Sequence, residues 1–265
     1  MLLSLFQKNE FLDAATSNWI FDTFAWALTE FEQDVFSKDS QLILPINSFY
    51  PGNVSSIAEM AQSVFDNTLK YAGMQHWPIR LVSPEQYQGQ QQMPKLQFKD
   101  VMRGDKVTVI NNDYTDTSVN EILVSYNPAQ INQPQDLVAS FAQAFAAILI
   151  SQRGSLPPGG EKFVSQAIDL VACFMGFGVM FANTAYQFKG GCGTCYNKHA
   201  NREAALPEQE MVYCLALFSI LKGMRIKDVS YYLKSHLRSS FKQAYKDINK
   251  QLKNTDNQRL LAVKI

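Results

Sequence analysis

The chain has 265 residues, of which 46% are hydrophobic and 18% charged, so it is long and apolar enough to bury a substantial core. These proportions exclude a wholly disordered chain. The formal net charge is zero, although residues 1–150 carry 16 acidic and 8 basic side chains and residues 151–265 carry 8 and 16. Halves of opposite charge are expected to pack against each other or to meet an acidic partner, but the neutral total argues against nucleic acid.

The N-terminus and the cysteines indicate the compartment. Polar residues at 7–10 interrupt the apolar start at 1–6, which argues against a signal peptide. The longest apolar stretch, Leu170–Ala182, has 13 residues, against the ~20 of a membrane-spanning helix. Four cysteines do not make a disulfide framework, and Cys173 and Cys214 lie in apolar stretches typical of reduced core residues. We therefore expect a cytoplasmic protein without a transmembrane segment.

The first part of the chain predicts two helices and a short strand. Apolar residues recur with a helical period over residues 11–36, and Gln41–Pro45 is a strand candidate closed by a proline. Ser56 and Glu59 have the spacing of a capping box, so a second helix is expected to begin there. Gly73 is the expected end of that helix.

Strand-like segments dominate the next part of the chain. Four segments are rich in β-branched or other apolar residues and are bounded by turn formers: 79–82, 95–99, 106–110 and 121–126. They predict a small sheet of about four strands. The glutamine-rich stretch at 86–93 is interpreted as a solvated loop between the first two of them.

From Pro134 onward the pattern is helical. Helices are expected over 136–152, 162–188, 207–222 and 228–252, with Gly154 and Gly223 as stop signals. The prediction is a single α+β domain over 1–265, in which N-terminal helices and the sheet (11–130) pack on a C-terminal helical bundle (134–252). A short tail follows at 253–265.

Several stretches of the sequence resemble segments of one known family. In chain order they are Leu42–Pro45 with Phe49–Pro51, Ala72–Met74 with Trp77-Pro78, Leu137–Ala142, Asp169–Asn183, and Glu210–Phe218. Together they resemble a family of small bacterial proteins that carry an H-E-x-x-H zinc-metallopeptidase-like helix, over roughly residues 11–250. The resemblance implies a zincin-like core, in which Leu137–Ala142 leads directly into the zinc helix.

The chain departs from that family at the residues that would carry the chemistry. Where the family has H-E-x-x-H, this chain reads Gln143-Ala144-Phe145-Ala146-Ala147. A zinc helix needs two imidazoles at i and i+4 and a glutamate as general base, and neither alanine offers a ligand or a base. The resemblance places a third, carboxylate ligand where Ser165 stands. We therefore expect a pseudoenzyme that binds neither zinc nor another cofactor and acts by binding an unidentified protein partner.

Asp169 is the only charged residue between Lys162 and Lys189. A carboxylate in so apolar a helix must be paired or protonated, and we expect a structural hydrogen bond to a nearby amide or helix end. The resemblance implies a different role in the family, in which such an aspartate supports the metal ligands through hydrogen bonds.

A glycine-rich loop carries the alternative hypothesis. Cys192 and Cys195 form a C-x-x-C motif, and His199 follows four residues later. Three such residues offer part of a zinc site or a redox thiol pair, but the motif also fits a plain loop. Zinc at this loop is the alternative to a cofactor-free protein.

The last predicted helix has a basic side next to its apolar stripe. The basic residues recur every four positions: Lys234, Arg238, Lys242, Lys246 and Lys250. Such a ridge suits phosphate, acidic lipid or an acidic protein surface, although a solvated helix face has the same pattern.

Overall fold

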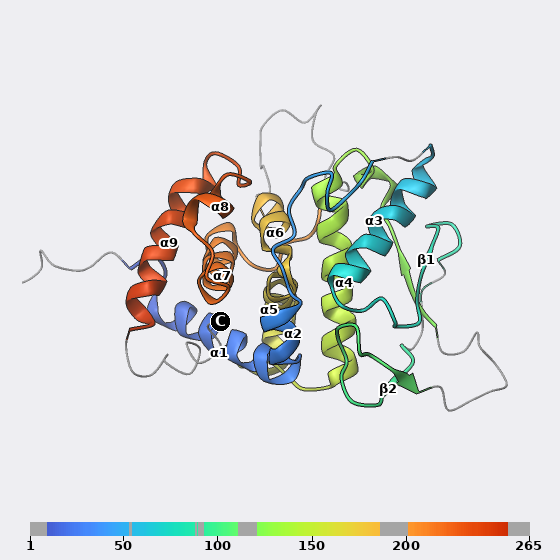
Figure 1. Cartoon of the computed structure of the whole chain (residues 1–265), viewed down its shortest axis with the longest axis horizontal. Helices are drawn as coiled ribbons and strands as arrows, with labels where there is room; N and C mark the ends of the chain where they lie inside the picture. The colour runs from blue at the N-terminus through green and yellow to red at the C-terminus, as the bar shows by residue number, and fades with distance from the viewer. Residues whose placement is uncertain are drawn as a thin grey trace, which may run out of the picture.

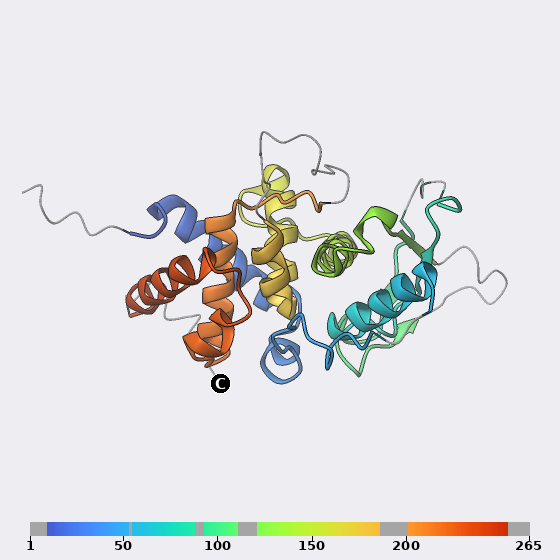
Figure 2. The ribbon, with the colours of Figure 1, turned by 90° about the horizontal axis from the view of Figure 1, so that it is seen from above.

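The computed structural model describes residues 10–52, 55–87, 89, 93–110, 121–185 and 201–253. In both views, helix α4 (Pro134–Arg153) lies in the middle of the molecule (Figures 1 and 2). Helix α3 (Ile57–Tyr71) and the strands lie on one side of α4, and the remaining helices lie on the other. The protein is thus α+β, with far more helix than strand. One cluster of buried apolar residues contains members from both sides of α4, from Phe65 to Leu217.

The strands form two small sheets instead of the expected sheet of four. Strand β1 (Ile79–Val82) pairs in parallel with β4 (Ile122–Ser125). Strand β2 (Gln97–Phe98) pairs antiparallel with β3 (Val109–Ile110). The two sheets are joined by side-chain packing, because the Trp77 ring lies 4.6 Å from that of Phe98 and its indole donates to the Met102 carbonyl at 2.7 Å.

The first predicted helix is two helices, α1 (Ala14–Glu30) and α2 (Gln33–Lys38). The break falls at Glu32, whose φ of 56° is not helical. Its carboxylate accepts a hydrogen bond from Met102 N at 2.9 Å, a contact that local periodicity does not reveal.

The prediction of a strand at Gln41–Pro45 was wrong as well. That segment is extended but not part of a sheet, and Ile43 N donates instead to Gly176 O at 2.9 Å.

Helix α3 begins and ends as its sequence predicts. Ser56 Oγ accepts from Glu59 N at 3.2 Å, and Gly73, with a φ of 72°, follows its last residues. The Glu59 carboxylate reaches back by one residue more than in a standard capping box, since it accepts from Ser55 N at 2.9 Å.

The long helix expected over 162–188 is broken in the middle. A 3-10 turn, η2 (Gly160–Phe163), leads into α5 (Val164–Ala172), a π-helical segment η3 (Cys173–Phe177) and α6 (Gly178–Thr184). Gly176 has a φ of 108°, which only glycine adopts readily. A Cβ atom at this position would overlap the Gln41 carbonyl oxygen, so the break also makes room for the extended segment.

The C-terminal part contains α7 (Glu208–Leu221), α8 (Ile226–Ser230) and α9 (Leu237–Gln251). The predicted helix over 228–252 is therefore two helices. Helix α7 is buried from Met211 to Leu221, and α9 packs along it. A 3-10 turn, η1 (Pro128–Gln130), precedes α4 and completes the described elements.

Two helical stretches of the described chain, Pro134–Arg153 and Gly160–Thr184, are long and apolar enough to cross a membrane. Their most apolar windows are 56% and 72% buried inside the fold. Such burial is typical of the core helices of a soluble protein.

Candidate functional site

The four positions that the resemblance aligns with zinc-site residues line one pocket. Helices α4 and α5 pack against each other and bring together Gln143, Ala144 and Ala147 from α4 with Ser165 from α5. We call this cavity of about 680 Å³ the Gln143 pocket. Its other lining residues are Ser140, Gln166, Ile168, Glu203, Ala204 and Ala205. Three of them come from the segment before α7, which closes one side of the pocket.

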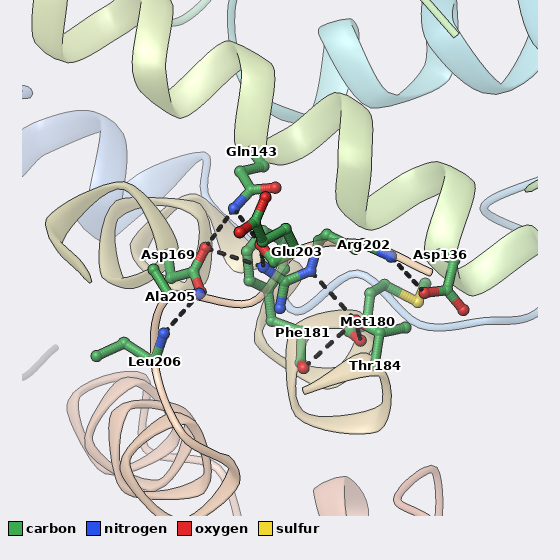
Figure 3. A network of polar contacts seen from close by, with 10 residues as sticks. All are labelled: Asp136, Gln143, Asp169, Met180, Phe181, Thr184, Arg202, Glu203, Ala205 and Leu206. Carbon is green, nitrogen blue, oxygen red and sulfur yellow. Dashed lines mark hydrogen bonds and ion pairs between the residues drawn. The ribbon is translucent and has the colours of Figure 1, made fainter. Parts of the chain in front are cut away.

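Beneath the pocket, Asp169 is completely buried and fully hydrogen-bonded (Figure 3). Its Oδ1 atom accepts from Gln143 Nε2 and from Arg202 Nη1, both at 2.9 Å. Its Oδ2 atom accepts from the backbone N–H groups of Ala205 and Leu206, at 2.9 and 3.1 Å. Four donors and a positive charge satisfy the carboxylate, which removes the usual penalty of burying it alone.

A structural hydrogen bond from a nearby amide was expected for Asp169, and the donors are the side-chain amide of Gln143 and the backbone amides of Ala205 and Leu206. Sequence reasoning missed Arg202, whose side chain is 1% exposed. Its guanidinium lies over the Phe181 ring at 4.1 Å, and its backbone N–H donates to Asp136 Oδ1 at 3.2 Å. No local pattern identifies this arginine, because its partner lies 33 residues away on another element.

The residues of the Gln143 pocket do not fit a zinc ion. Gln143 offers only a neutral amide, a poor zinc ligand, whose nitrogen donates to Asp169 and, at 3.0 Å, to the Glu203 carbonyl oxygen. Ala144 and Ala147 have no donor atom, and Ser165 offers only a neutral hydroxyl. Within the residues that the structure describes, no three His, Cys, Asp or Glu side chains are grouped as a metal site requires.

The cysteines fall into two groups. Cys192, Cys195 and His199 lie outside the described residues, so their zinc and redox hypotheses stay predictions. Cys173 and Cys214 are free, completely buried thiols, as expected for core residues. Burial raises the pKa of both, because a thiolate is poorly solvated there.

The residues of the predicted basic ridge are all exposed, but they do not form one helical row. Helix α9 begins at Leu237, so Lys234 lies in the preceding turn, where its backbone N–H donates to Asn183 Oδ1 at 3.0 Å. Arg238 donates to the carbonyls of Leu233 and Tyr231, at 3.0 and 3.2 Å. Four of the five, Arg238, Lys242, Lys246 and Lys250, thus keep their spacing on α9, although the Arg238 guanidinium bonds to the preceding turn.

Comparisons with family models, with curated proteins and with solved structures found no match to this chain.

Proposed function

We propose that this protein is a non-catalytic relative of zincin-like metallopeptidases, in which the cleft around the degenerate zinc helix binds a partner protein. The observation that carries the proposal is the convergence of Gln143, Ala144, Ala147 and Ser165 on one pocket above a buried aspartate. The spacing of Gln143, Ala144 and Ala147 places them on one face of α4, but it does not bring Ser165 of α5 to that face. A site that has lost its ligands accounts for this convergence, which supports the family resemblance.

The chemistry of the pocket supports the loss of catalysis. Peptide hydrolysis by a zincin needs a metal to polarise the carbonyl and a carboxylate to take a proton from water. At the positions of the resembling motif, this chain has an amide, two methyl groups and a hydroxyl. The positive charge next to Asp169 comes from the Arg202 guanidinium at 2.9 Å.

Binding is proposed in place of catalysis because the pocket is both open and firmly supported. The exposed residues Ser165 and Glu203 are part of its lining, so a partner can reach it from solvent. Here Asp169 connects α5 to α4 through Gln143, and to the segment before α7 through Arg202, Ala205 and Leu206. These bonds fix the relative positions of the three walls of the pocket, which are α4, α5 and the segment before α7. A preformed binding site requires such support.

Zinc affinity and hydrolysis test the non-catalytic part of the proposal. We expect zinc to leave the melting temperature of the chain, purified without a histidine tag, unchanged. We also expect no zinc-dependent hydrolysis of a casein substrate. Zinc-dependent hydrolysis by the native chain would refute the proposal.

Restoring the motif is the complementary experiment. The combined variant Gln143→His, Ala144→Glu, Ala147→His and Ser165→Glu should bind zinc, whereas Ala147→His alone should not.

The double variant Cys192→Ser with Cys195→Ser tests the alternative function, a zinc or thiol site at the cysteine loop. Zinc that purifies with the native chain and is lost from this double variant would favour a metal site at the cysteine loop.

A further inference from the structure

The orientation of the Gln143 side chain determines which polar atom it presents to its pocket. Its Nε2 atom lies 2.9 Å from Asp169 Oδ1 and 3.0 Å from Glu203 O, and both of these atoms are acceptors. Only the NH₂ end of an amide can face two acceptors, so the assignment of nitrogen and oxygen is unambiguous. The Oε1 atom therefore points away from Asp169, as Figure 3 shows, and has no hydrogen-bond partner among the described residues.

Two more side chains that line the pocket carry acceptors. On α5, the oxygen of the Gln166 amide has no partner within the described part of the chain, and rotation of the amide brings it to the pocket. Before α7, Glu203 lines the pocket with an exposed side chain. Such groups are stabilised by a ligand that donates hydrogen bonds, and a buried unpaired oxygen gains most from one.

The charge of the pocket favours a positively charged ligand. Among the described residues that line the pocket, Glu203 alone is ionisable. The neighbouring cation, Arg202, is paired with Asp169 and packs on Phe181, so its charge is already balanced. The described lining residues thus carry one negative charge and no positive one, which favours a positively charged ligand.

We propose that the Gln143 pocket binds the ammonium group of a lysine side chain on a partner protein, an inference that rests on the proposed binding function. An ammonium has three donors that rotate freely, whereas a guanidinium has a rigid planar fork suited to one carboxylate. The acceptors here come from three different elements, α4, α5 and the segment before α7. The small alanine side chains leave a cavity of about 680 Å³ that admits the methylene stem.

The first test uses Nα-acetyl-lysine methylamide and its norleucine analogue, which has nearly the same shape but no charge. We expect the lysine compound alone to shift the side-chain amide NMR signals of Gln143 and Gln166, with weaker binding at high salt. Equal binding of the norleucine compound would overturn the assignment. n-Pentylamine serves as the free amine with one charge, and its tighter binding would contradict the proposal that the ligand is a lysine side chain of a protein.

Variants locate the binding in the pocket. Glu203→Gln should weaken binding of the lysine compound about fivefold, whereas Glu161→Gln, an exposed change outside the pocket, should have no effect. Ala147→Leu narrows the cavity and should abolish binding. An unchanged affinity in Glu203→Gln would overturn the ammonium site. That result would leave the non-catalytic proposal intact, because the latter depends on zinc affinity and hydrolysis.

Discussion

Arg202 Nη1 lies 2.9 Å from Asp169 Oδ1, and the two side chains are 1% and 0% exposed. A pair of charges buried this deeply is costly to break, because the remaining partner keeps its charge without solvent. The pair joins α5 to the segment that covers the Gln143 pocket. Its integrity therefore determines both the stability of the helical half and the shape of the pocket.

Breaking this ion pair is the first prediction. Arg202→Met should lower the free energy of unfolding by about 3–5 kcal/mol, because Asp169 would be left buried without a countercharge. Asp169→Asn should also be destabilising, since an amide cannot accept from Gln143, Arg202, Ala205 and Leu206 at once. Urea denaturation of each variant measures the effect.

An exposed ion pair is the matched control. Arg80 Nε lies 2.8 Å from Glu121 Oε2, but the side chains are 55% and 36% exposed. Arg80→Met should cost no more than about 1 kcal/mol. Similar losses of unfolding free energy in Arg80→Met and Arg202→Met would contradict the prediction that a buried ion pair is costlier to break than an exposed one.

The second prediction concerns the glycine at which α5 and α6 meet. Gly176→Ala should destabilise the protein by at least about 3 kcal/mol, since the new methyl group would be strained at a φ of 108° and would overlap Gln41 O. Gly223→Ala, at a φ of 64° with open space around its Cβ position, should cost only about 1–2 kcal/mol. Thermal unfolding compares the two, and equal losses would mean that the contact with Gln41 is unimportant.

Helix ends were predictable from the sequence because their causes are local. Gly73, Gly154 and Gly223 all have positive φ where helices were expected to stop, and Ser56 caps α3. The breaks at Glu32 and Gly176 were not predictable, because Met102 and Gln41 lie far away in the sequence.

The same distinction applies to the candidate site. The i, i+4 spacing of Gln143 and Ala147 predicts a shared helix face, and both line the pocket. The need of Asp169 for a partner was likewise evident from its apolar surroundings. The identity of Arg202 was not, because a partner 33 residues away is selected by the tertiary fold.

The third prediction concerns two glutamates whose pKa values shift in opposite directions. Hydrogen bonds from the Ser55 hydroxyl and backbone lower the pKa of Glu59, so its stabilising contribution is present above pH 4.5 and is lost as the pH falls. Burial, with repulsion from Asp13, raises the pKa of Glu210, so its contribution is present below pH 4.5 and is lost as the pH rises.

Substitution should therefore change the pH dependence of stability in opposite senses. Glu59→Gln should reduce the loss of stability on acidification, whereas Glu210→Gln should increase stability at neutral pH relative to pH 4. Melting temperatures between pH 3 and pH 7 provide the measurement. Parallel changes in the two variants would be inconsistent with these assignments.

The fourth prediction concerns the buried thiols. In the variant Cys192→Ser with Cys195→Ser, the only remaining cysteines are Cys173 and Cys214, both completely buried. Neither should react with Ellman's reagent in the native state at pH 8, because burial raises the pKa of both thiols and blocks access. Denaturant should then release both, and rapid reaction without denaturant would show that the α5–α7 core opens.

The position of Gly176 in the sequence also matters during synthesis of the chain. At this non-helical turn, in the most apolar part of the sequence, the Gly176 carbonyl accepts a hydrogen bond from Ile43 N at 2.9 Å. Synthesis proceeds from the N-terminus, so the donor is made 133 residues before the acceptor. When the apolar stretch around Gly176 emerges from the ribosome, Ile43 has already been made. The Gly176 carbonyl can therefore be paired as soon as this stretch is buried, and a buried carbonyl without a partner would be costly.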